Sequence, residues 1–134
     1  MSTLVNAEMI TDLFGCFLEG HGFRVVATNS VGYELSVSFE NDRKGITVFV
    51  EQGSSTWVSI YDPSNRALSA DLKFVCWAVC GDDVKDLISR YGGLDVPSQL
   101  RNNLDDLKRC LPQLLKGSDD LLVKASLEAR RYNS

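Results

Sequence analysis

The stretch that decides the fold is YELSVSFE, residues 33–40, in which apolar and polar side chains alternate strictly. Its apolar residues are Tyr33, Leu35, Val37 and Phe39. In an extended chain these four side chains point to one face and the residues between them to the other, so the stretch predicts an antiparallel strand with one buried face. A polar loop at 41–45 then predicts a hairpin into a second strand at 46–51.

Two further strands are expected, one on each side of this hairpin. Residues 23–28 are rich in β-branched side chains, and residues 56–61 follow a turn at 52–55. A second turn at 62–65 closes the unit, because its Pro63 cannot donate a hydrogen bond to a strand ladder. The sequence therefore predicts a four-stranded antiparallel meander.

Helical periodicity surrounds this sheet. An N-terminal helix is expected over 3–19, where apolar residues recur at spacings of three and four. The helices expected after the meander cover 68–80, 82–91, 97–116 and 119–131. The β-branched and aromatic content of 68–80 leaves a strand open there, and Pro112 is expected to kink or break its helix. The order predicts one α+β domain over residues 1–134, with an N-terminal helix and C-terminal helices packed on the sheet.

Composition and charge limit the classes of ligand. The 134 residues include 18 Asp and Glu against 14 Lys and Arg, which gives a formal net charge of −4. An acidic chain is poorly suited to nucleic acid, because phosphates are neutralised by Lys and Arg. No apolar run approaches the length that spans a bilayer, and the N-terminus lacks the pattern of a secretory signal. We therefore expect a cytoplasmic protein that binds neither nucleic acid nor membrane directly.

Candidate catalytic groups are few. His21 is the only histidine and lies between two glycines, where a turn is the simpler interpretation. The acidic pairs at 82–83, 105–106 and 119–120 fall at expected helix starts or on exposed helix faces, where carboxylates are stabilised by the helix dipole or by water. The four scattered cysteines are expected to be reduced and mostly buried. The sequence thus predicts no catalytic residue, metal site or cofactor, and no enzyme.

The polar side of the predicted sheet is the candidate functional surface. Alternation places Phe49 and Trp57 there together with carboxylates, and such aromatics anchor protein interfaces while charges steer a basic partner. The predicted partner-binding residues are Glu34, Glu40, Asp42, Glu51, Trp57, Tyr61 and Asp62. The alternative is that C-terminal helices cover this side, in which case the aromatic residues belong to the core.

The order of elements resembles that of immunity proteins, small bacterial proteins encoded beside polymorphic, contact-dependent or type VI toxins. The resembling segments are 17–23, 33–39, 41–43 leading into 46–50, 100–107 and 125–132. The chain departs from the pattern at 74–80. The resemblance implies a cytoplasmic, non-enzymatic antitoxin that binds one cognate toxin domain and occludes its active site. A nuclease toxin with a basic cleft would suit such an acidic inhibitor.

A second class remains open, that of the small acidic secretion chaperones. These are also α+β proteins, and they bind an extended effector segment as dimers. An obligate dimer with a large apolar interface would favour the chaperone, whereas a monomer or weak dimer is expected of the immunity protein.

Overall fold

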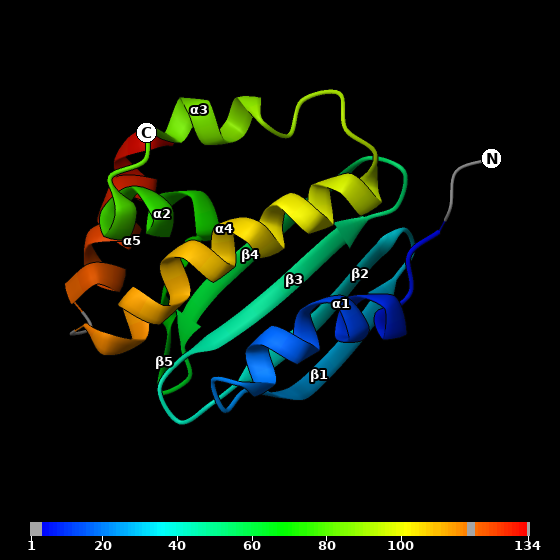
Figure 1. Ribbon diagram of the computed structural model, residues 1–134, viewed down its shortest axis with the longest axis horizontal. Helices are drawn as coiled ribbons and strands as arrows, with labels where there is room; N and C mark the ends of the chain where they lie inside the picture. Colours follow the sequence, from blue (N-terminus) through cyan, green and yellow to red (C-terminus); the bar gives the residue numbers. More distant parts are fainter. Residues whose placement is uncertain (1–3, 118–119, 134) are drawn as a thin grey trace.

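The computed structural model describes residues 4–117 and 120–133 (Figure 1). Its strands are β1 (Arg24–Val31), β2 (Glu34–Glu40), β3 (Gly45–Glu51), β4 (Ser55–Asp62) and β5 (Asn65–Asp71). Its helices are α1 (Ala7–Glu19), α2 (Leu72–Cys80), α3 (Val84–Ser89), α4 (Val96–Lys116) and α5 (Asp120–Tyr132). The strands form one antiparallel sheet in sequence order, and α1 and α4 lie across it in Figure 1. The α+β prediction, with helices packed on a sheet, is confirmed.

The buried face of the sheet follows from alternation. Val37, Val48 and Ile60 occupy neighbouring strands on the helix side and are 0% exposed. The prediction that Tyr33 joins this core is wrong, because its side chain is 79% exposed. It follows Gly32 in the two-residue turn between β1 and β2, where Gly32 has a positive φ of 59°.

The sheet has five strands, so the expected four-stranded meander is incomplete. Residues 68–71 were expected to be helical, but they belong to β5, which pairs with β4 from Asp62↔Asn65 to Ser59↔Asp71. Ala70 of this strand is buried beside its partner Ile60. The alternation in β5 is short and mostly polar, so the stronger helical signal that follows obscures it. The helical interpretation holds from Leu72 onward.

The structure also differs from the prediction at the end of the first strand and at Pro112. The first strand runs through Asn29 and Ser30 to Val31, beyond the end expected at residue 28. At the other end, α4 continues past Pro112 to Lys116, so a break at the proline is wrong. The proline removes only the bond to the carbonyl of Lys108, a residue on the exposed side of α4, where water can replace it. No helix among the described residues is long and apolar enough to cross a membrane.

Arg43 ties the loop between β2 and β3 to the end of α4. Its guanidinium donates hydrogen bonds to the carbonyl of Leu115 and, at 3.2 Å, to that of Gly117. These carbonyls lie at the C-terminal end of the helix, where intrahelical donors run out. Arg43 therefore joins the sheet to the helix layer at one point.

Replacing this arginine tests that connection. Arg43→Ala is expected to lower the free energy of unfolding by about 1 kcal/mol, because two helix-end carbonyls lose a charged donor that is itself exposed. Urea denaturation measures the change. The neighbouring Asp42→Ala is the control and should change stability by less than about 0.5 kcal/mol. Equal effects of the two substitutions would contradict the assignment.

Candidate partner-binding face

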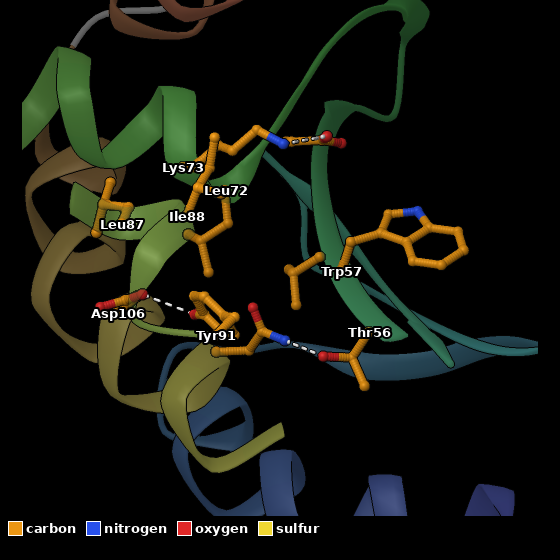
Figure 2. A pocket seen from close by; sticks show the side chains of 11 residues that line it. Thr56, Trp57, Leu72, Lys73, Leu87, Ile88, Tyr91 and Asp106 are labelled. Carbon is orange, nitrogen blue, oxygen red and sulfur yellow. Dashed lines mark hydrogen bonds and ion pairs between the residues drawn. The ribbon is translucent and has the colours of Figure 1, made fainter. Parts of the chain in front are cut away.

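The side of the sheet that faces away from the helices is called the outer face below. Its residues on β2, β3 and β4 include Glu34, Ser36, Ser38, Glu40, Thr47, Phe49, Glu51, Trp57, Ser59 and Tyr61. Figure 2 shows the Trp57 side chain pointing away from α3 and α4. Phe49 and Trp57 are half-buried and lie outside the hydrophobic core cluster. The alternative in which helices cover these aromatic residues is therefore wrong, since the described helices pack on the opposite side.

An aromatic stack occupies the middle of the outer face. Phe49 and Trp57 lie directly opposite each other on β3 and β4. Their ring centroids are 5.1 Å apart and their planes differ by 10°. Two flat rings held by a sheet present a rigid apolar platform, which loses little conformational entropy when a partner covers it.

A polar cluster lies at one end of this face. The hydroxyl of Tyr61 donates to Oε2 of Glu40 at 2.6 Å, and Nη2 of Arg66 contacts the same oxygen at 3.0 Å. The Arg66 guanidinium also lies 5.1 Å from the centre of the Tyr61 ring. Burial, together with the hydrogen bond to Glu40, raises the pKa of Tyr61 to about 12. Glu40 and Tyr61 thus already have intramolecular partners, and Tyr61 is 6% exposed.

A pair of acidic residues marks the other end. Glu34 and Glu51 are opposite each other in the β2–β3 register, and both are exposed. Within residues 4–117 and 120–133 neither carboxylate has a hydrogen-bond or salt-bridge partner. Like charges directly opposite in a sheet are destabilising, so this pair lowers the stability of the fold.

The last two predicted residues lie in turns. Asp42 is exposed in the loop between β2 and β3. Asp62 accepts hydrogen bonds from the backbone N–H and the hydroxyl of Ser64, and these bonds lower its pKa. The seven predicted residues therefore divide by role. Glu34, Asp42 and Glu51 are unengaged acids, Trp57 is half of the stack, and Glu40, Tyr61 and Asp62 support the fold.

A small cavity lies on the helix side of β4. Pairing with β5 ends at Ser59↔Asp71, so residues 55–58 have no strand beside them on that edge. Leu72, Ile88 and Tyr91 reach into this space and leave a cavity of about 170 Å³ (Figure 2). The side chain of Gln99 takes the place of a strand, because it accepts from the Thr56 N–H and donates to the carbonyl of Ser54. The edge of β4 is thus partly closed by the chain itself.

The sequence interpretation missed the buried carboxylate beside this cavity. Asp106 was expected on a solvated helix face, but it is 2% exposed. Its Oδ1 accepts from Arg90 at 3.0 Å and Arg109 at 2.9 Å, and its Oδ2 accepts from the Tyr91 hydroxyl at 2.8 Å. The available signal was Arg109 three residues later on the same helix. The neighbouring Asp105 is exposed, as expected.

The remaining acidic pairs lie at helix starts. Asp83 caps α3 by accepting from the N–H groups of Lys85 and Asp86. Asp120 is the first residue of α5, and Asp119 lies outside the described residues. Both observations agree with the helix-start interpretation.

The residues considered for catalysis lie apart from the outer face. His21 is in the turn after α1, where its ring packs edge-on against that of Phe17 with the ring centroids 4.9 Å apart. All four cysteines are free, Cys76 and Cys110 are buried, and only Cys16 is exposed. A hydrogen bond with Cys76 and burial raise the pKa of the Cys110 thiol. Among the residues that the structure describes, no three His, Cys, Asp or Glu side chains form a group able to hold a metal ion.

Comparisons with known proteins give no further constraint on this face. No family model matches the chain, and no curated protein or solved structure matches it.

Proposed function

We propose that this chain is an immunity protein whose outer sheet face binds a basic toxin domain and blocks its active site. The observation that carries the proposal is the Phe49–Trp57 stack on a sheet face left open by the described helices. Central aromatic residues in interfaces carry much of the binding energy when a partner excludes water from them. The proposed occupant of the face is therefore a folded protein surface.

The charge of the face supports a basic partner. Glu34 and Glu51 oppose each other without a cation among the described residues, an arrangement that disfavours folding but favours a positively charged ligand. Asp42 adds another unengaged carboxylate on the loop at the opposite end of β3. Carboxylates held by a rigid sheet can occupy the phosphate-binding positions of a nuclease cleft.

Reversal of one of these charges tests the proposal. Glu51→Lys is expected to weaken binding to the toxin domain encoded beside this chain at least ~10-fold, because one attractive charge becomes repulsive. Thermal stability should stay the same or rise, since the change removes the repulsion from Glu34. Isothermal titration gives the affinity, and differential scanning calorimetry gives the stability. Glu40 is unsuited to this test because Tyr61 and Arg66 depend on its carboxylate.

Glu19→Lys is the matched control, since it makes the same charge change on α1, on the other side of the sheet. It should leave affinity within about twofold of the parent. Co-expression supplies the functional readout, because the parent chain should restore growth to cells that produce the toxin domain. Failure to bind or to protect, or a neighbouring reading frame without a toxin domain, would overturn the proposal.

A further inference from the structure

The edge strand β1 pairs with β2 on one side, and no strand of the described chain pairs with its other side, although α1 contacts it. All eight of its residues are exposed, including Val25, Val26 and Val31. The opposite edge differs, because α5 packs against β5. From Val25 to Val31 the strand lacks proline and charged side chains, two of the means by which proteins protect an edge, and its one irregularity is the register shift between Val25 and Ala27. We propose that β1 pairs with β1 of a second copy of this chain, in antiparallel orientation, to join two sheets into one.

The turn at the end of β1 fixes which backbone groups are available. Val31 and Glu34 flank the two-residue turn and form the last pair of the hairpin. Residues in that position bond to each other, so Val31 directs its peptide groups toward β2. Alternation then directs the N–H and C=O groups of Ser30 and Thr28 outward. The register shift between Val25 and Ala27 limits regular geometry to residues 27–31.

A twofold axis selects one register for this segment. Two identical antiparallel strands related by such an axis must place one residue opposite itself. With Asn29 on the axis, Thr28 of each copy lies opposite Ser30 of the other, and about four backbone hydrogen bonds can form. On the outer face Ala27 then meets Val31, which is 78% exposed in the single chain. Placing Thr28 on the axis would instead bring the irregular Val26 into the ladder.

Charge favours a second copy as the occupant of this edge. The only charged residue of β1 is Arg24 at its start, and the turn at its other end is followed by Glu34. Antiparallel pairing brings Arg24 of one copy toward Glu34 of the other, twice by symmetry. Because the charged cross-strand neighbour of Glu34 within its own chain is the repulsive Glu51, this approach of Arg24 would offset an unfavourable interaction in each copy. The shared interface is mainly backbone, so it differs from the large apolar interface expected of a chaperone.

Cysteine cross-linking tests the register directly. In a Cys16→Ser background, which removes the exposed thiol, Asn29→Cys is expected to form a covalent dimer under glutathione disulfide. The two thiols introduced at position 29 of a dimer would lie directly opposite each other, at a residue pair that exchanges no backbone hydrogen bonds across the interface. Ala27→Cys and Val31→Cys are matched controls that should cross-link poorly alone but efficiently when the two variants are mixed. Equal cross-linking of all three single variants would show random collision and overturn the proposal.

Sedimentation equilibrium measures the association without any cross-link. The parent chain should approach twice 14.8 kDa at about 0.1 mM. Ser30→Pro should remain monomeric while circular dichroism shows a folded chain, because the lost N–H points outward. A parent chain that stays monomeric, or sheds its dimer only by unfolding, would overturn the pairing. A chain that stays monomeric alone, and whose outward β1 amides become protected from exchange only when the toxin domain is added, would assign the edge to that partner instead. Cross-linking and sedimentation of the chain alone need no toxin, so their failure is distinct from failure of the proposed function.

Discussion

Gly45→Ala is expected to displace the ring of Tyr61 and to lower the free energy of unfolding by about 2 kcal/mol. The two residues are opposite each other in the β3–β4 register, and the tyrosine ring lies across the glycine on its way to Glu40. A Cβ at position 45 would come within 2.1 Å of the ring atom Cζ. The ring cannot stay in place, so the partly buried hydrogen bond to Glu40 is lost with it. Urea denaturation measures the loss.

A double-mutant cycle separates this clash from any general intolerance of Gly45. In a Tyr61→Ala background the ring is gone, and Gly45→Ala should be neutral or stabilising by up to about 1 kcal/mol, because alanine is less flexible than glycine when unfolded. The expected coupling between the two sites is therefore about 2 to 3 kcal/mol. The same loss in both backgrounds would show that the ring is not what excludes a side chain at position 45.

This contact also explains why part of the outer face was misjudged from sequence. Alternation correctly placed Glu40 of β2 and Tyr61 of β4 on the same side of the sheet. It could not show that a glycine on the strand between them opens a path for the ring. The two side chains therefore engage each other and Arg66 and are not free for a partner. Alternation along a strand predicts which face of the sheet a side chain occupies. Which side chain it contacts there depends on cross-strand register and residue size.

The middle of the sheet was predictable for a simple reason. β2, β3 and the second half of β4 are covered on one side, so burial imposes a clean alternation on their sequences. β1 is exposed throughout and β5 has only Ala70 fully buried. With little burial to impose a pattern, the end of β1 and the whole of β5 gave no comparable signal. The helix after β5 was predicted partly from the length of the apolar stretch that contains Phe74, Val75 and Cys76, which are buried together, whereas the composition of that stretch left a strand open.

Asp106 was missed for a different reason. Both residues of the pair 105–106 are acidic, and both were expected on the solvated face of the helix. Asp106 is buried because Arg90 and Tyr91, in the segment after α3, fold over it. That segment lies outside α4 and is joined to it by a loop that contains Gly92 and Gly93. The contacts with Arg90 and Tyr91 are tertiary and depend on the path of this loop, which the spacing of residues along one helix does not encode.

Asp106→Ala is expected to lower the free energy of unfolding by about 3 kcal/mol, against less than about 0.5 kcal/mol for Asp105→Ala. The substitution leaves the Tyr91 hydroxyl and two guanidinium groups without their shared acceptor. The value lies at the low end for a buried charge because the side chains of Arg90 and Arg109 are 43% and 42% exposed and can be hydrated. Urea denaturation of the two variants provides the comparison.

The location of the damage distinguishes a buried anchor from a general loss of helix stability. Asp106 connects α4 to the end of α3 and the residues after it, so amide exchange should accelerate most in 84–95. Asp106→Asn keeps the volume but removes the charge, and it should fall between the parent and Asp106→Ala because Tyr91 can still donate to its oxygen. A uniform increase in exchange along α4, with 84–95 unchanged, would show that the carboxylate does not hold the α3 segment. Asp is a poorer helix former than Ala, so without this contact an aspartate at position 106 would have no stabilising role in the helix.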